Sequence, residues 1–257
     1  MAGTATRPGG DLTFVRLAGA PDDLVRDFHA GLLRSTFPPD ELESLDDLRA
    51  TLATGADGVL ALDGERIVGG VVHEPFVGGA VRLVGYLVVD ASMRGRGLGP
   101  RLLAAARAQS DSGLVLGEIE DPRHFAVSAD DDPVARVRFW ARLGCRLLPL
   151  PYVQPALHDG ARRVRHLLLI ALPQGDDPLP EAVPGRLVGD FLTEYFAASE
   201  GTVSPQDPDL RPLLERCEAP TLRLWPLDRL DVVDVDGADG TDGTDGTVHT
   251  AADVTEG

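Results

Sequence analysis

A predicted strand, a loop of glycines and arginines and a predicted helix follow one another in the middle of this chain. Residues Val81–Val89 are an apolar, β-branched run typical of a buried strand. Residues 100–108 are strong helix formers, and Pro100 suits the first helical position, where its missing N–H costs nothing. The loop between them holds three glycines and two arginines in residues 94–99. Converging backbone amides, a helix N-terminus and guanidinium groups together predict a phosphate-binding site.

Two common phosphate motifs fit this loop poorly. A Walker A loop needs a lysine, and all 24 basic residues of the chain are arginines, so P-loop chemistry is excluded. A Rossmann fingerprint needs a third glycine, but Gly95-x-Gly97-x-x is followed by Pro100. Acidic residues do stand about twenty positions further on, at Glu118 and Glu120, so dinucleotide binding stays open as an alternative.

The spacing Arg94-x-x-Gly97-x-Gly99 resembles the R/Q-x-x-G-x-G/A acyl-CoA loop of the GNAT superfamily of N-acyltransferases. The preceding Leu87-Val88-Val89 resembles the L-x-V strand of that family. Residues 132–145 read as a capped helix that resembles its penultimate helix, with Asp132 at the N-cap and Gly144 at the left-handed C′ position. The resemblance covers residues 11–173.

The resemblance implies a mixed α/β fold (an α+β mixed sheet) in which two central strands splay apart between flanking helices. It also implies acetyl-CoA or another acyl-CoA as donor, with the pantetheine arm paired to the strand backbone and an N–H polarising the thioester carbonyl. The acyl-CoA-binding residues that it implies are Leu87, Val88, Val89, Arg94, Gly95, Arg96, Gly97, Leu98 and Gly99.

Acyl transfer to an amine needs a base, because an ammonium has no lone pair. Glu118 and Glu120 lie two apart on a predicted strand and so share one face, and two carboxylates near each other raise the pKa of one of them, which suits a proton acceptor. His73 and Glu74 are the next candidates. The family often carries a proton-donating tyrosine in the penultimate helix, but this chain has Trp140 there, which leaves Tyr152, water or an unassisted leaving group.

Charge and composition narrow the partners and the compartment. The formal net charge of −17 argues against nucleic-acid binding, although eight of the acids lie in residues 231–257. No apolar run approaches the roughly 20 residues of a membrane span, and no secretory signal is visible. Two cysteines suggest free thiols in the cytoplasm, and no residue cluster has metal-ligand spacing.

The order of elements extends this prediction along the chain. Besides those already given, we expect strands at 12–17, 58–62, 66–73, 114–120, 146–153, 163–171 and 222–225, and helices at 22–34, 40–52, 185–198 and 209–217. Asp63-Gly64 marks a type I′ hairpin turn. The predicted organisation is an acyltransferase domain at 11–173, a C-terminal helical extension at 174–230 and a disordered acidic tail at 231–257.

The expected function is N-acylation of a small-molecule amine, with acetyl-CoA as the default donor. Succinyl-CoA as donor, protein acetylation and a non-catalytic acyl-CoA sensor remain alternatives, and a homodimer remains open.

Overall fold

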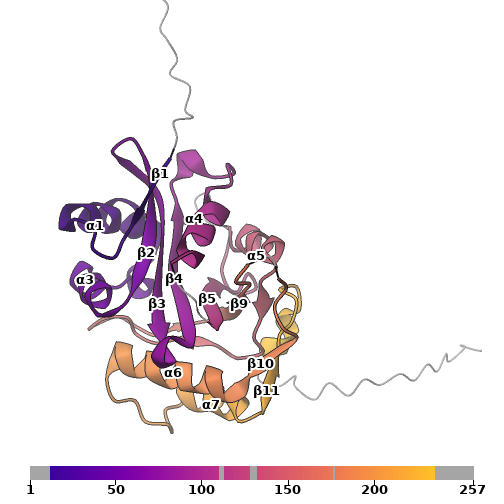
Figure 1. Ribbon diagram of the computed structural model, residues 1–257. Coiled ribbons are helices and arrows are strands. Elements are labelled where there is room, and N and C mark those ends of the chain that lie inside the picture. The colour runs from indigo at the N-terminus through magenta and orange to yellow at the C-terminus, as the bar shows by residue number, and fades with distance from the viewer. Residues whose placement is uncertain (1–11, 110–112, 128–131, 176, 235–257) are drawn as a thin grey trace, which may run out of the picture.

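The computed structural model describes residues 12–109, 113–127, 132–175 and 177–234 (Figure 1). A mixed sheet runs in the order β1-β2-β3-β4-β5-β9-β6, with only β4 and β5 parallel among its pairs. Its strands are β1 Thr13–Arg16, β2 Asp57–Asp63, β3 Arg66–Phe76, β4 Val81–Val89, β5 Leu114–Glu120, β6 Arg146–Leu147 and β9 Leu167–Leu172. The predicted α/β class and mixed sheet are confirmed.

Helices cover both faces of this sheet, with α1 and α3 on one side of the strands and α4 on the other (Figure 1). The α-helices are α1 Asp22–Phe28, α2 Arg34–Thr36, α3 Leu45–Thr54, α4 Leu98–Arg107, α5 Pro133–Arg142, α6 Gly185–Glu200 and α7 Leu210–Cys217. A π-helical segment, η1 His29–Leu33, joins α1 to α2, and short 3-10 turns are η2 Pro39–Glu41, η3 Val77–Gly79, η4 Ala91–Met93 and η5 Leu230–Val233.

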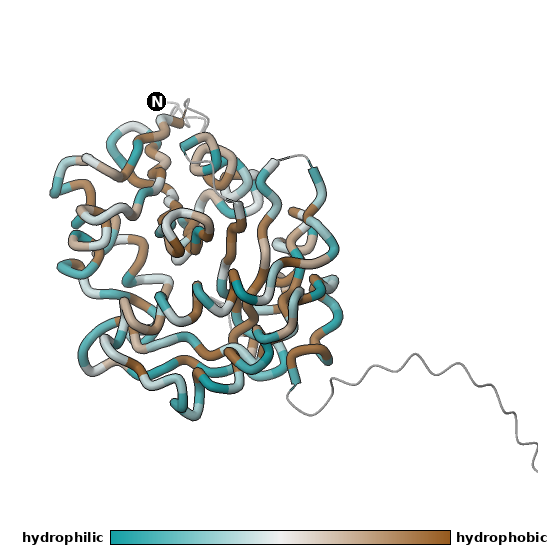
Figure 2. The backbone as a smooth tube through the Cα atoms, turned by 60° about the horizontal axis from the view of Figure 1, so that its bottom comes forward, coloured by the Kyte–Doolittle hydropathy of each residue, from teal (hydrophilic) through white to brown (hydrophobic). Residues whose placement is uncertain are grey.

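Alternation along β5 shows how the two faces are filled. Leu114 and Leu116 pack in a core with α6 and α7, whereas Val115 and Ile119 pack in a second core with α4 and α5. A third cluster joins α1 and η1 to β3 and β4. Figure 2 shows the hydrophobic residues concentrated along the central strands and the hydrophilic ones toward the outer loops.

Strands β4 and β5 pair only at their beginnings. Their parallel register runs from Val81 opposite Leu114 to Val84 opposite Gly117 and stops there, although β4 continues to Val89 and β5 to Glu120. Gly85 is a β-bulge, because on β3 Val72 pairs with Tyr86 while His73 pairs with Val84. The two strands therefore separate from Gly85 and Glu118 onward, which is the predicted splay.

Several predicted boundaries move. Helix α4 begins at Leu98 rather than Pro100, with Gly97 at its N-cap, so Pro100 occupies the third helical position. Helix α3 begins at Leu45 rather than 40, because the Ser44 side chain accepts from the Asp47 amide and caps the helix there. The helix predicted at 22–34 extends to Thr36 through the π-helical segment.

The strands predicted at 146–153 and 163–171 are broken into pieces. Only β6 and β9 join the main sheet, while β7 Val153–Gln154 and β8 Val164–Arg165 form a separate ribbon. The prolines at 149 and 151 lack the amide that a continuous ladder needs. Gln154 thereby projects from a short ribbon of its own.

The C-terminal residues pack on the same core as the sheet. Helices α6 and α7 and the ribbon of β10 Ala182–Pro184 with β11 Thr221–Arg223 join the cluster that holds Leu114. The start of the predicted acidic tail, 231–234, packs elsewhere: Val233 in η5 is buried in the core with α4 and α5, and Asp234 accepts a hydrogen bond from Arg123 at 3.0 Å. The rest of that tail, 235–257, lies outside the described residues. Over the described ranges, every helix is too short or too polar to cross a bilayer.

Candidate active site

The loop after β4 has the backbone shape of an anion cradle. Gly95 and Gly97 both have φ near 73°, a left-handed conformation that costs other residues roughly 1–2 kcal/mol. A Cβ at either position would meet nothing within 4 Å, so the space above the backbone is open. Because Gly97 is the N-cap of α4, the first amides of the helix lack partners within it and are available to a ligand.

Two residues of this loop face inward instead. The Leu98 side chain is buried in the α4 core, so that only its backbone amide can serve a ligand. A Cβ on Gly99 would lie 3.1 Å from the Phe139 ring of α5. The absence of a side chain at Gly99 therefore allows α4 to pack closely on α5. This packing is a structural reason for the glycine, in addition to its predicted part in binding acyl-CoA.

Arg94 and Arg96 are exposed on the loop. Within the part of the chain that the structure describes, neither guanidinium has an acidic partner, and Arg94 makes only a long hydrogen bond of 3.4 Å to the Val89 carbonyl. Both charges are thus available next to the helix N-terminus. Together with the glycines they supply the donor set that a polyphosphate requires.

The strand segment 87–89 borders the splay. Its residues pair with β3 on one edge, but past Val84 the other edge of β4 has no strand partner among the described residues. Val88 is buried, while Leu87 and Val89 are half-buried against the α4 core. Gly85 is exposed in the middle of the sheet, and a Cβ there would meet nothing within 4 Å. The splay is therefore open enough to admit an extended chain along β4.

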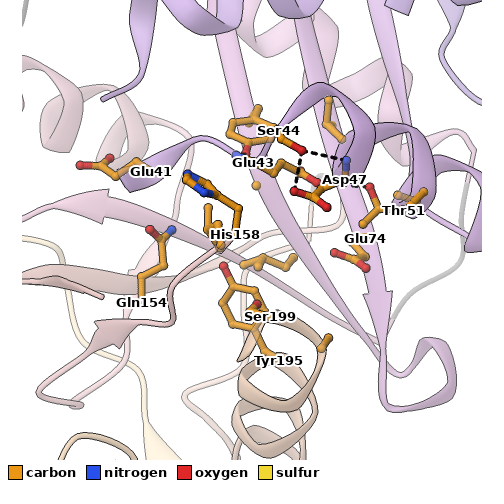
Figure 3. A pocket seen from close by; sticks show the side chains of 18 of the residues that line it. Glu41, Glu43, Ser44, Asp47, Thr51, Glu74, Gln154, His158, Tyr195 and Ser199 are labelled. Carbon is orange, nitrogen blue, oxygen red and sulfur yellow. Dashed lines mark hydrogen bonds between the residues drawn. The ribbon is translucent and has the colours of Figure 1, made fainter. Parts of the chain in front are cut away.

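A pocket of about 590 Å³ opens at this fork, on the face of the sheet between α3 and α6 (Figure 3). Gly85 and Glu118, the residues at which the strands separate, both line it, whereas none of residues 94–99 does. The other polar residues of its wall are Glu41, Glu43, Ser44, Asp47, Thr51, His73, Glu74, Tyr86, Gln154, His158, Asp159, Tyr195 and Ser199. The loop at 94–99 is thus not part of the pocket wall.

Three side chains donate hydrogen bonds to the carboxylate of Glu118. Tyr152 donates a short hydrogen bond to Oε1, the Gln154 amide donates to Oε2 at 2.8 Å, and the Tyr195 hydroxyl lies 3.5 Å from Oε2. Burial raises the pKa of Glu118, and these hydrogen bonds act in the opposite direction. The cause of the raised pKa is therefore burial rather than the neighbouring carboxylate Glu120.

Glu120 does not line this pocket. Its carboxylate is 8% exposed and forms an ion pair of 2.5 Å with Arg136 of α5. Sequence spacing placed Glu118 and Glu120 on one face, but the last residues of β5 lie beside α5, which supplies a guanidinium. The two carboxylates are therefore in different environments, and only Glu118 borders the pocket.

The proton-donor candidate Tyr152 is buried, and so is Trp140, which stands at the position of the family's tyrosine. Tyr152 is 2% exposed, does not line the pocket, and its pKa is well above the usual value because of burial and then of Glu118. Trp140 packs in the α4–α5 core with 6% exposure. The Tyr152 hydroxyl is oriented toward Glu118, so it can act on the pocket through that carboxylate.

Sequence reasoning missed Glu43, which lines the pocket together with the predicted candidates His73 and Glu74. Burial, and then Glu74, raise the pKa of Glu43 to about 7, while burial and then Glu194 raise the pKa of Glu74. The Glu43 amide donates to the Tyr86 hydroxyl at 3.0 Å. The motif Ser44-x-x-Asp47 is a helix-start signal. It could have shown that the helix begins after Glu43, which places Glu43 in the preceding loop.

His73 also lines the pocket and is 2% exposed. Burial and then Arg82 lower its pKa to about 4, so the ring is neutral at pH 7. Its Nδ1 faces an Arg82 donor at 2.7 Å and therefore accepts, which leaves the proton on Nε2. Among the described residues, Nε2 has no hydrogen-bond partner. The described residues also contain no group of three or more side chains suited to a metal ion.

Comparison with known families agrees with this geometry. Residues 24–144 match the model of the Acetyltransferase (GNAT) family. The chain therefore carries a domain of the GNAT superfamily, whose members perform acyl-CoA-dependent acetyl transfer.

A solved structure of this superfamily shares the fold over part of the chain, and two others are similar to it at lower TM-scores. A GNAT-family protein from Bacteroides thetaiotaomicron is 21% identical, with a TM-score of 0.50 over 64% of this chain and 88% of its own. The aminoglycoside 6'-N-acetyltransferase from Enterococcus faecium is 18% identical, with a TM-score of 0.46 over 65% and 99%. A GNAT acetyltransferase from Elizabethkingia anophelis with acetyl-CoA bound is 14% identical, with a TM-score of 0.43 over 64% and 99%. At 21% identity the likeness to the Bacteroides protein extends to the fold alone. A search of curated proteins finds no match.

Proposed function

We propose that this protein is an N-acyltransferase that transfers the acyl group of an acyl-CoA, by default acetyl-CoA, to the amine of a small molecule bound in the pocket. The observation that carries the proposal is the place of Glu118. It lies where β4 and β5 separate and lines the pocket on one side of that fork. A carboxylate at this position can contact an amine that approaches the splay.

The residues around the splay fit an acyl-CoA. The open backbone at Gly95 and Gly97, the first amides of α4 and the guanidinium groups of Arg94 and Arg96 would hold its phosphates. The free edge of 87–89 would align its extended arm. The bound thioester supplies an activated acyl group and a thiolate leaving group. Residues of the pocket would bind the amine and remove its proton.

Glu118 would accept the proton of the bound ammonium. Its carboxylate is stabilised by hydrogen bonds from Tyr152 and Gln154, yet burial raises its pKa, so it is a stronger base than an exposed glutamate. We assign Tyr152 as a positioning residue that acts through Glu118. We further propose that residues 174–230 complete the acceptor pocket, because Tyr195 and Ser199 of α6 form part of its wall.

Thiol release tests this function. The protein is incubated with acetyl-CoA, succinyl-CoA or no donor and with a broad panel of amines, and free CoA thiol and acylated product are both measured. An N-acyltransferase releases one thiol for each acylated amine with at least one member of the panel. Tight acetyl-CoA binding without release across the whole panel would instead favour a sensor, and NAD binding without CoA binding would favour a dinucleotide site.

A further inference from the structure

The pocket wall is strongly anionic. Its lining includes six carboxylates: Glu41, Glu43, Asp47, Glu74, Glu118 and Asp159. None of the described residues that line it is an arginine, and the chain has no lysine. Of the two histidines in the wall, His73 is neutral at pH 7, and His158 has a pKa raised by its backbone hydrogen bonds. Six carboxylates that face at most one imidazolium repel one another and lose hydration, so the wall favours a positively charged occupant.

A second observation points to a hydrogen-bond donor in the pocket. Gln154 is 5% exposed, and its amide nitrogen is used by Glu118 at 2.8 Å. Its carbonyl oxygen Oε1 is buried without a partner among the described residues. A buried acceptor left unpaired costs free energy that a donor from the pocket would recover. An ammonium group next to Glu118 supplies three such donors.

The carboxylates are arranged in two places rather than one. Glu118 comes from β5 and lies with Gln154 and Tyr195, whereas Glu43 precedes α3 and Glu74 comes from β3. Figure 3 shows Gln154 and Glu74 on opposite sides of the pocket with Tyr195 between them. A single ammonium at Glu118 would leave the charges of Glu43 and Glu74 uncompensated.

The pair formed by Glu43 and Glu74 has little internal compensation. Glu43 receives a long hydrogen bond of 3.4 Å from the Thr51 hydroxyl and another from the Tyr86 hydroxyl, both of them neutral groups, while Asp47 is already engaged in capping α3 through Ser44. Each of the two glutamates has a raised pKa, and Glu74 contributes to the shift of Glu43. A cation bound between them would reverse both effects.

We infer that the acceptor carries at least two ammonium groups, one that reacts beside Glu118 and a second that Glu43 and Glu74 bind. The acceptor class is thus a diamine or polyamine rather than a monoamine. This inference rests on the proposed function, because it names the substrate class of the same pocket. The neutral end of a monoamine would leave the half-buried carboxylates of Glu43 and Glu74 without a cation, which lowers its affinity.

Pairs of acceptors of equal length test the inference. Diaminopropane, diaminobutane and diaminohexane are each compared with the amino alcohol of the same length, in which one ammonium is replaced by a hydroxyl. We expect the best diamine to exceed its amino alcohol by at least about tenfold in kcat/KM, mostly through KM. In the E43Q/E74Q variant this ratio should fall toward one. The control E65Q removes a carboxylate at the β2–β3 turn, outside the pocket, and should keep the ratio.

The possible outcomes separate the inference from the function on which it rests. Equal kcat/KM for every pair, or a ratio that survives E43Q/E74Q, overturns the second subsite while acyl transfer stands. If no amine is acylated, the proposed function fails, and calorimetry of diaminohexane with the CoA-bound protein decides the inference. Binding that weakens at least about tenfold in E43Q/E74Q and not in E65Q supports it. Absent or unchanged binding contradicts it.

Discussion

The hydroxyl of Tyr152 donates a hydrogen bond to Oε1 of Glu118, from a segment more than thirty positions further along the chain. This bond orients the carboxylate at the fork between β4 and β5, and it lowers the pKa that burial raises. The base strength of Glu118 is thus set by two opposing effects, desolvation and hydrogen bonding. Each can be altered separately by mutation.

Replacing Glu118 by Gln should remove the proton acceptor and leave the fold intact. We expect the limiting rate to fall by roughly 10²–10⁴, the range for general acid–base catalysis, while acetyl-CoA affinity changes little. Steady-state kinetics and calorimetry measure the two quantities. E65Q is the matched control, with the same change of group at an exposed turn. Near-normal turnover in E118Q would move the base to Glu43 or Glu74.

Replacing Tyr152 by Phe should shift the pH profile rather than abolish turnover. Loss of the hydrogen bond removes an influence that lowers the pKa of Glu118, so that pKa rises. The pH at which the rate increases should therefore move upward in Y152F, and the rate on the high-pH plateau should stay within about tenfold of the unmodified protein. If instead the high-pH rate of Y152F falls far below that of the unmodified protein, and the pH at which the rate increases does not move, then Tyr152 itself transfers the proton.

Replacing Gly97 by Ala should weaken CoA binding. The left-handed backbone, φ near 73°, costs an alanine roughly 1–2 kcal/mol, and relaxation of the loop would turn the first amides of α4 away from the phosphates. Gly64 has φ near 62° and no neighbour within 4 Å of a Cβ, so G64A is the matched control. We expect similar losses of thermal stability in both variants and a CoA affinity lowered at least about tenfold only in G97A. Equal affinities would contradict the phosphate site.

Replacing Glu43 by Gln should change the pH dependence of stability. The pKa of Glu43 is about 7 in the folded state against an ordinary value of 4.5, so between these pH values the folded state holds its proton more tightly than the unfolded state. The free energy of unfolding therefore falls as pH rises through that window, and E43Q avoids the loss.

Urea denaturation at several pH values measures this effect. We expect E43Q to gain about 1–3 kcal/mol over the unmodified protein at pH near 8 and almost nothing at pH near 4. E65Q should show no such pH-dependent gain. A constant difference between E43Q and the unmodified protein across the pH range would mean that Glu43 has an ordinary pKa.

Replacing Val233 by Ala should destabilise the fold, although this residue lies in the segment that composition assigned to the acidic tail. Its side chain is 7% exposed and packs with the α4–α5 core, so we expect a loss of about 1–3 kcal/mol in the free energy of unfolding. Val127 is 61% exposed, and V127A should cost little. Equal effects of the two substitutions would show that η5 does not pack as described.

Capping and turn residues in the sequence correctly predicted the helix ends and turns that depend only on neighbouring residues. Asp132 caps α5, Pro133 is its first residue, and Gly144 follows its C-terminal end with φ near 80°, as the sequence indicates. The strand–loop–helix unit around 94–99 is likewise present, because turns and caps need only neighbouring residues. The hairpin at Gly64 follows from the same kind of signal. The strand–loop–helix unit and the order of elements could therefore be predicted from the sequence.

The surroundings of each carboxylate were decided by tertiary structure. Glu118 and Glu120 have the same spacing signal, yet one borders the pocket with Tyr152 and Gln154 and the other pairs with Arg136. Period-two alternation indicates which residues share a face, but the neighbours on that face come from distant segments.

The acidic pocket depends on the same long-range packing. Glu43 and Tyr195 stand more than 150 positions apart in the sequence, and packing of α3 and α6 on one face of the sheet brings both to its wall. The bulge at Gly85 and the end of pairing after Gly117 open the fork between them. Sequence alone determined the residue types and the local backbone shapes. Strand pairing and core packing decided which charges meet, because desolvation and hydrogen bonding act through neighbours in space.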